Sequence, residues 1–166
     1  GKRMIEGFIG PGQALPDADL ESVIAQVPES RLAEHPLLDR SAEIRVRHAR
    51  GQSFPDWLAM RSGQFEFFPD AVALPETSEQ VQELIQLAKE LDAIVIPYGG
   101  GTSVAGHITP QQSDKPIITV ALTRMNKLLD LDEESQIATF GAGANGPELE
   151  AQLHAKGYVL GHFPQS

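Results

Sequence analysis

The amino-acid sequence predicts an α+β fold, in which packed helices cover a small mixed β-sheet. Short apolar runs bounded by proline and glycine alternate with an amphipathic segment in the middle of the chain, which is typical of a β-α-β unit. The second half contains two further runs separated by a polar turn, which predict a β-hairpin. A chain of 166 residues, 41% of them hydrophobic, is long enough to bury one core.

The N-terminal region, residues 1–68, is expected to be a helical and irregular lead-in. Residues 1–15 contain four glycines and one proline, and they predict an irregular, mobile segment. Apolar residues at helical spacing predict a short amphipathic helix within 16–27. The Arg-rich stretch 31–63 is interrupted by prolines, so we expect broken helices there, one of them near 56–61.

A strand, a helix and a second strand are predicted next. Residues 71–74 form a short apolar run closed by a proline, which indicates a strand. Thr77 is placed to cap a helix, and Gln80 completes a capping box three residues later. Five apolar residues share one face of this helix: Val81, Leu84, Ile85, Ala88 and Leu91. Residues 94–96 then predict a buried strand.

The second half of the chain predicts more strands. Residues 117–121 form one, and residues 128–131 and 136–140 are expected to pair as a hairpin. Four acidic residues lie in or beside the turn: Asp130, Asp132, Glu133 and Glu134. They could be mistaken for a metal cluster, but a hairpin turn without calcium-loop spacing favours a solvated face. We therefore expect no metal site.

A second glycine-rich turn, residues 141–146, leads into the last predicted helix. Pro147 suits the first helical position, and the acidic residues after it suit the first turn. Gly157 is expected to end this helix as its C-cap. Residues 158–160 predict one more strand.

Charge and composition exclude several classes of function. The net charge of −10 argues against nucleic acid as a partner, because phosphate contacts need clustered basic residues. One basic cluster exists, formed by Arg40, Arg45, Arg47 and Arg50. Either the acidic remainder balances it, or it meets an anionic substrate or another domain. The absence of cysteine excludes disulfides and fits a cytoplasmic setting, and no apolar run is long enough to span a membrane.

The most informative stretch is a glycine loop that follows the strand at 94–96. Its residues are Pro97, Tyr98, Gly99, Gly100, Gly101, Thr102 and Ser103. Successive N–H groups without side chains can hold phosphate oxygens, and two hydroxyl groups add donors. The P-loop motif is excluded because His107 and Ile108 stand where it requires Lys and Ser or Thr, and Val104 excludes the dinucleotide fingerprint. From the loop alone, an anion site and a structural turn both stay open, and His107 either acts near the phosphate or is a plain loop residue.

Several segments, in a fixed order, carry a family resemblance. These are residues 69–77, 96–103, 122–127, 141–149 and 157–166. They resemble the FAD domains of the vanillyl-alcohol-oxidase family, and within it the alkyl-dihydroxyacetonephosphate-synthase branch. An Arg/His-rich segment and a terminal Gly-His-x-Pro-x-Ser motif are similar to that branch too. The resemblance covers about residues 45–166.

This resemblance implies a PCMH-type first FAD-binding subdomain that begins at residue 69 and continues to residue 166 as the first part of that domain. It implies that residues 97–103 wrap the FAD pyrophosphate, and that Gln165 and Ser166 begin a second cofactor-binding loop. Gln165 departs from the branch, which often has Asp there. Thr102 stands where some members carry a histidine that binds FAD covalently, so non-covalent FAD is expected.

The resemblance also implies an N-terminal part of a larger enzyme, whose later domains bind the small-molecule substrate and supply the catalytic residues. No catalytic residue is therefore expected in this chain. The leading hypothesis is a FAD-dependent oxidoreductase that transfers hydride from a small hydroxylated substrate, such as a 2-hydroxy acid or alcohol. The alternatives are an alkyl-dihydroxyacetonephosphate-synthase-like flavin-dependent transferase, and an isolated fragment without activity or cofactor. Exposed apolar surface on such a fragment would favour a homo-oligomer.

Overall fold

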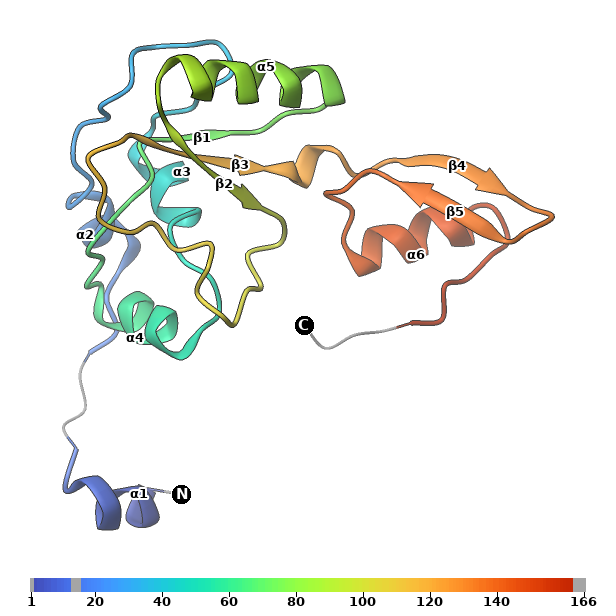
Figure 1. The fold of residues 1–166 in the computed structure, drawn as a ribbon. Coiled ribbons are helices and arrows are strands. Elements are labelled where there is room, and N and C mark those ends of the chain that lie inside the picture. Colours follow the sequence, from blue (N-terminus) through green and yellow to red (C-terminus); the bar gives the residue numbers. More distant parts are fainter. Residues whose placement is uncertain (1, 13–15, 163–166) are drawn as a thin grey trace.

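A computed structural model describes residues 2–12 and 16–162, and its strands form two separate sheets (Figure 1). A three-stranded parallel sheet has the order β1-β3-β2, and a two-stranded antiparallel sheet pairs β4 with β5. The strands are β1 (Ala71–Ala73), β2 (Ile94–Tyr98), β3 (Ile117–Ala121), β4 (Leu128–Asp132) and β5 (Ile137–Phe140). The predicted α+β class is confirmed, with parallel and antiparallel strands kept apart.

The central strand β3 organises the core of the parallel sheet. All five of its residues are buried, and it pairs in parallel with both β1 and β2. Successive side chains of a strand point to opposite faces. Ile118 and Val120 accordingly pack in one cluster with Leu84 of the covering helix, whereas Ala121 packs in a second cluster with Tyr98.

Helix α5 (Ser78–Glu90) covers the first of these faces, as Figure 1 shows. The Thr77 side chain accepts a hydrogen bond from the Gln80 N–H, as predicted, but the Gln80 side chain accepts from the N–H of Glu76. The predicted apolar face is too wide: Ile85 and Leu91 are exposed. Leu91 is the C-cap residue of α5, and Leu87, which was not on the predicted face, packs against the core.

Strand β2 is not the buried strand that its apolar sequence predicts. Ile94 is 39% exposed and Val95 is 37% exposed. The reason is topological. The crossover through α5 leaves a gap between β1 and β2, and β3 enters that gap, so β2 becomes an edge strand.

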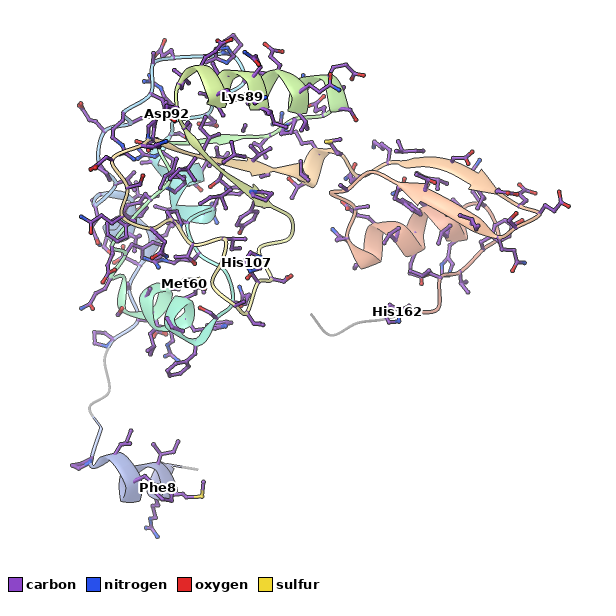
Figure 2. The ribbon with its side chains drawn as sticks, viewed as in Figure 1. Phe8, Met60, Lys89, Asp92, His107 and His162 are labelled. Carbon is purple, nitrogen blue, oxygen red and sulfur yellow. The ribbon has the colours of Figure 1, made fainter. Side chains whose placement is uncertain are left out.

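The N-terminal region contains more helix than the sequence predicts. Residues 2–9 form helix α1 (Lys2–Ile9) in place of the expected irregular segment, because apolar residues at helical spacing outweigh the glycines. This helix lies apart from the sheets, and Phe8 is exposed on it (Figure 2). Helix α2 (Leu20–Ile24) is shorter than expected. The broken helices are confirmed as α3 (Ala42–Arg47) and α4 (Phe54–Ser62).

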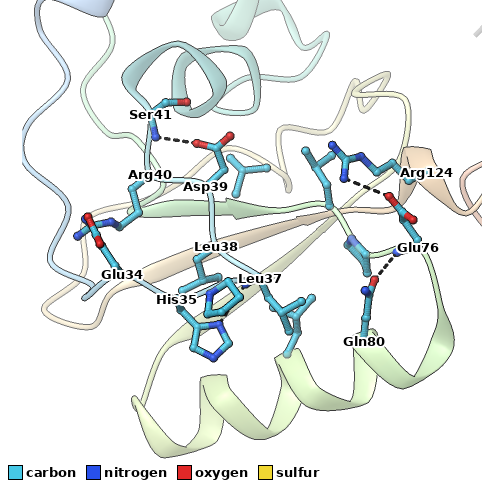
Figure 3. A pocket seen from close by; sticks show the side chains of 15 residues that line it. Glu34, His35, Leu37, Leu38, Asp39, Arg40, Ser41, Glu76, Gln80 and Arg124 are labelled. Atoms are coloured by element: carbon cyan, nitrogen blue, oxygen red, sulfur yellow. Dashed lines mark hydrogen bonds and ion pairs between the residues drawn. The ribbon is translucent and has the colours of Figure 1, made fainter.

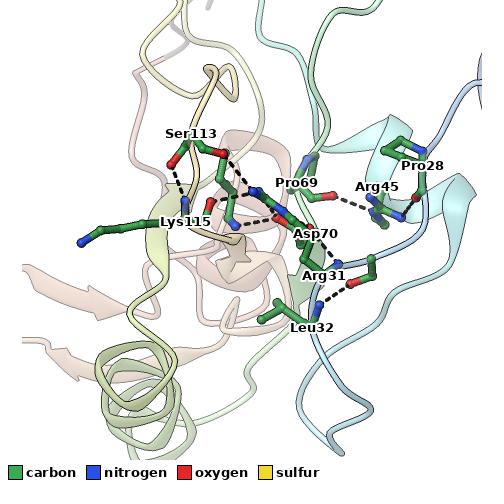
Figure 4. Close-up of polar contacts among 10 residues, drawn as sticks. Pro28, Arg31, Leu32, Arg45, Pro69, Asp70, Ser113 and Lys115 are labelled. Carbon is green, nitrogen blue, oxygen red and sulfur yellow. Dashed lines mark hydrogen bonds and ion pairs between the residues drawn. The ribbon is translucent and has the colours of Figure 1, made fainter.

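Buried polar groups tie this region to the parallel sheet (Figure 4). Arg31 Nη2 lies 2.7 Å from Asp70 Oδ2, and the same oxygen accepts a hydrogen bond from the Ile117 N–H. Burial by itself would raise the pKa of Asp70, but the hydrogen bonds from Arg31 and Ile117 lower it below its ordinary value. Arg45 is buried and donates to the carbonyl groups of Pro69 and Pro28.

The predicted basic cluster is therefore occupied by contacts within the chain. Arg45 anchors the sheet, Arg40 pairs with Glu34 and Arg47 pairs with Glu43. These contacts favour the interpretation in which the cluster is balanced internally.

The hairpin β4–β5 and helix α6 (Gly146–His154) form a second unit, joined to the first through the short 3-10 helix η1 (Leu122–Arg124). The Asp132 carboxylate accepts hydrogen bonds from two N–H groups of the turn, which agrees with a solvated hairpin turn. Asn145 and Glu148 form a capping box at the start of α6. The strand predicted at 158–160 is wrong. The Glu150 carboxylate takes up the N–H groups of Leu160 and Gly161 instead.

Candidate cofactor site

The glycine loop leaves β2 at the carboxyl end of the parallel sheet, which is the end where open α/β sheets bind ligands. Gly99 and Gly100 are exposed, and a Cβ at either position would have no contact with a neighbouring heavy atom, apart from Thr102 beside Gly100. Within the described residues, no backbone N–H from Gly99 to Ser103 donates a hydrogen bond. The loop therefore offers unbonded donors, and those of Gly99, Gly100 and Thr102 belong to exposed residues.

The buried Tyr98 side chain packs against the glycine loop at Gly101. Its ring is buried 4.8 Å from the ring of His48, and its hydroxyl lies 3.4 Å from the carbonyl oxygen of Arg47. Burial raises the pKa of the Tyr98 phenol. Gly101 has a φ of +71°, and a Cβ there would lie 2.8 Å from Tyr98 Cζ. Because the Tyr98 side chain is buried, only the backbone of this residue is available to contact a ligand.

The far end of the loop is fixed at Ser103. The carbonyl oxygen of Ser103 accepts a hydrogen bond of 2.7 Å from the Gln52 N–H. A Cβ on Gly51 would lie 2.7 Å from that same oxygen, so glycine permits the close approach of the two segments. Ser103 Oγ lies 3.1 Å from Nδ1 of His107, which Figure 2 labels on the same loop.

A buried carboxylate, Asp56, supports the segment that follows the glycine loop, through a hydrogen bond from Thr109. Asp56 is 2% exposed and accepts hydrogen bonds from the hydroxyl groups of Ser53, at 2.6 Å, and Thr109, at 2.8 Å. Arg50 Nη1 lies 3.8 Å away. Burial by itself would raise the pKa of Asp56, but hydrogen bonds from Ser53 and Thr109 and the charge of Arg50 lower it.

The sequence did not predict these contacts of Asp56. The spacing of Ser53 and Asp56 is that of a capping box, which is a detectable signal, and both groups do cap α4. Thr109, however, lies 53 residues beyond Asp56, and nothing in the sequence connects the two.

A hollow of the described residues lies away from the glycine loop (Figure 3). It has a volume of about 1010 Å³ and runs along β1 and the start of α5, with walls from residues 34–41 and residues including Val72, Leu74, Glu76, Gln80 and Arg124. Its arginines are paired, Arg40 with Glu34 and Arg124 with Glu76. None of residues 97–103 lines it. The glycine loop is therefore not part of this hollow.

In the second glycine-rich turn, residues 141–146, glycine is required at Gly141 and Gly143 by close backbone packing. A Cβ on Gly141 would overlap the carbonyl group of Met125, and one on Gly143 would overlap that of Leu122. The Gly143 N–H donates to the Met125 carbonyl oxygen at 3.0 Å. Asn126 donates to Glu148 on α6, which joins two of the segments that carry the family resemblance.

Among residues 2–12 and 16–162, no group of three or more acidic or histidine side chains is placed to hold a metal ion. In the same part of the chain, no helix has the length and apolar character needed to cross a membrane. Gln165 and Ser166, expected in a second cofactor-binding loop, lie outside the described residues.

Comparison with known proteins gives the site its context. The family model described as FAD binding domain matches residues 69–166. The chain is 39% identical over 122 residues to alkyldihydroxyacetonephosphate synthase of Dictyostelium discoideum. This match covers 74% of this chain and 20% of that protein. A solved structure of an alkyldihydroxyacetonephosphate synthase superposes with a TM-score of 0.81 at 31% identity, over 96% of this chain and 33% of the other.

A different class of relative is also similar. The mitochondrial D-lactate dehydrogenase [cytochrome] of Kluyveromyces lactis is 28% identical over 96 residues, which is 58% of this chain and 17% of that protein. The chain thus spans about a fifth of the length of these curated relatives.

The residues present fit FAD. Free N–H donors and the absence of side chains on Gly99 and Gly100 suit a pyrophosphate, and no carboxylate lies within residues 97–103 to repel it. FAD, when bound, supplies the redox or electron-sink chemistry, and the protein supplies binding and orientation. Because the family model matches more than half of the chain, this protein belongs to the FAD-binding-domain family of flavoenzymes.

Proposed function

We propose that residues 97–103 bind the FAD pyrophosphate non-covalently through backbone N–H groups, with Thr102 and Ser103 adding hydroxyl donors. The observation that carries this proposal is the set of unbonded N–H groups from Gly99 to Ser103, which lies at the carboxyl end of the parallel sheet. Thr102 is exposed and has no nucleophilic ring nitrogen, which favours non-covalent binding.

We propose further that the whole protein is an alkyldihydroxyacetonephosphate-synthase-like flavoenzyme, a transferase in which flavin assists the reaction without net redox. This is supported by the higher identity to that class and by the TM-score of 0.81 over nearly the whole chain. A FAD-dependent oxidoreductase acting on 2-hydroxy acids is the second candidate, supported by the similarity to D-lactate dehydrogenase.

Other parts of the site are proposed on the same basis. Gln165 and Ser166 would begin a second cofactor-binding loop, and the substrate would be bound mainly outside these 166 residues. By itself the chain would hold FAD weakly and have no activity. The division between a lead-in ending at residue 68 and an FAD-binding part beginning at residue 69 stays a prediction.

Titration of the chain with FAD, followed by amide NMR, tests the pyrophosphate site even if binding is weak. The expected result is a set of shifts concentrated at the N–H groups of Gly99 to Ser103. The N–H group of Gly146 serves as an internal control whose shift should not change, because Gly146 also has open space around it but lies on α6. An unchanged glycine loop at saturating FAD would overturn the proposal.

The choice between the two enzyme classes needs the complete flavoprotein. Reduction of its flavin by a 2-hydroxy acid under anaerobic conditions would support the oxidoreductase. Formation of alkyldihydroxyacetonephosphate with the flavin oxidised before and after turnover would support the transferase.

A further inference from the structure

We propose that His107 sets the hydrogen-bonding state of Ser103, and so makes the affinity of the glycine loop for the cofactor phosphate depend on pH. In this role His107 is a positioning residue that acts through Ser103. The inference rests on the proposed function, because it concerns the same loop.

The geometry limits what the Ser103 hydroxyl can do. Ser103 Oγ lies 3.1 Å from His107 Nδ1, and this is its only hydrogen-bond partner among the described residues. The backbone of Ser103 is held by Gln52, so the hydroxyl group stays beside the free N–H groups of the loop. His107 itself is exposed and can exchange protons with water.

A hydroxyl group has one hydrogen to donate. When neutral His107 carries its proton on Nε2, Nδ1 accepts the Ser103 hydrogen, and the oxygen turns lone pairs toward an arriving anion. When Nδ1 carries a proton, it donates to Ser103 Oγ, and the hydroxyl hydrogen is free for a phosphate oxygen. A bound anion therefore favours protonated Nδ1. Molecules whose His107 carries protons on both ring nitrogens bind the anion without further change. In the others, neutral His107 either takes up a proton from water or moves its proton from Nε2 to Nδ1.

The surroundings leave this role to His107. It is the only basic side chain between Pro97 and Thr109. Tyr98 is buried against His48, away from the open side of the loop. The segment packed against the loop contributes Arg50 and Asp56, which face each other and Thr109. No ion pair to His107 occurs within the part of the chain that the structure describes.

The test is calorimetric titration of the chain with FAD, whose diphosphate diester keeps its charge from about pH 5.5 to about pH 8.5, the range in which histidine changes charge. The unchanged chain is expected to bind about tenfold more tightly at the acidic end, because a charge-assisted hydrogen bond replaces a competing one. His107→Asn places an amide N–H near the position of Nδ1, so it should bind with a nearly constant affinity. His107→Phe removes both the acceptor that competes for the Ser103 hydrogen and the donor to Ser103 Oγ, so its affinity should also stay nearly constant with pH.

Two variants separate positioning from simple charge. Ser103→Ala removes the hydroxyl, and the pH dependence should disappear with it. His154→Asn, an exposed histidine of α6, should keep the profile of the unchanged chain. A profile that persists in Ser103→Ala would show that His107 acts by charge alone and would overturn the positioning role.

The remaining outcomes distinguish the two proposals. If FAD binds and the pH profile is the same in His107→Phe, the inference about His107 fails while the proposed function stands. If FAD does not bind at any pH, both fail. Nitrogen NMR of His107 gives an independent readout: FAD should shift Nδ1 toward its protonated form, and an unchanged tautomer would contradict the inference.

Discussion

The two glycine-rich segments of this protein use glycine for opposite reasons. At Gly141 and Gly143 an added Cβ would overlap the backbone of Met125 or Leu122, so glycine is required by packing. At Gly99 and Gly100 no such contact with neighbouring backbone exists, and the N–H groups are unbonded. The comparison teaches that a glycine in contact with neighbouring backbone is explained by packing, whereas consecutive glycines with open space and unbonded N–H groups leave room for a ligand.

Acid should have the largest effect on this comparison. The Asp56 carboxylate supports the segment after the glycine loop and the Asp70 carboxylate ties the parallel sheet to Arg31, whereas the second glycine-rich turn packs against carbonyl groups. The pKa values of Asp56 and Asp70 are lower in the folded chain than the ordinary value of about 3.9. Their contribution to stability is therefore complete above that value and is lost as the pH falls through the lowered pKa values. Urea unfolding followed by circular dichroism should show the unfolding free energy falling steeply below about pH 4.

Asp56→Asn is the matched variant for the acid experiment. Ser53 and Thr109 donate to different oxygens of Asp56, so asparagine keeps an acceptor for only one of them, and it has no proton to gain at that position. The variant should be less stable near neutral pH and should lose less stability on acidification than the unchanged chain. An equal acid loss in both proteins would show that Asp56 does not carry the effect.

Gly143→Ala should give the next largest effect. Its Cβ would overlap the Leu122 carbonyl group, and backbone atoms must move to relieve the contact. A loss of about 2–3 kcal/mol in the free energy of unfolding is expected, as for overpacked sites. Gly146→Ala, at the first residue of α6, has open space and should change the free energy by less than about 0.5 kcal/mol. Similar losses in both variants would argue against the packing explanation.

Gly101→Ala tests the boundary between the two kinds of glycine. Gly101 belongs to the open loop, but its φ of +71° and its approach to Tyr98 resemble a packing constraint. Alanine at positive φ costs about 1–2 kcal/mol, and the buried Tyr98 ring must shift as well. Thermal unfolding should place this variant between Gly143→Ala and Gly146→Ala. A neutral result would mean that the loop rearranges freely around Tyr98.

Much of the fold could be predicted because local pattern and tertiary contacts agree. The helix capped by Thr77, strand β3 and the β4–β5 hairpin follow from periodicity and turn residues. The errors arise where tertiary contacts decide. Apolar β2 is exposed because β3 takes the centre of the sheet. No strand forms at 158–160, where the N–H groups of Leu160 and Gly161 donate to the Glu150 carboxylate.

The candidate site divides in the same way. Residues 97–103 could be proposed from the sequence, because consecutive glycines after a strand suit an anion and the family resemblance implies the FAD pyrophosphate, and this assignment stays a prediction. Their support could not, since it depends on contacts of long sequence separation. Asp56 reaches Thr109, and Gln52 reaches the carbonyl oxygen of Ser103. The link from Ser103 to His107 spans only four residues, yet its geometry depends on how the loop turns.

Gly100→Ala should have the smallest effect on stability and the most specific effect on binding. Gly100 does not have positive φ, and a Cβ there meets only the Thr102 methyl group at 3.7 Å, so the free energy of unfolding should change by less than about 0.5 kcal/mol. The same Cβ would stand on the open side of the loop, where a pyrophosphate must approach the N–H groups. FAD affinity should therefore fall about tenfold, or about 1.4 kcal/mol, in a calorimetric titration, with Gly146→Ala unchanged. If Gly100→Ala binds FAD normally, the open space around this glycine is not a cofactor site, and the distinction between the two glycine segments loses its functional meaning.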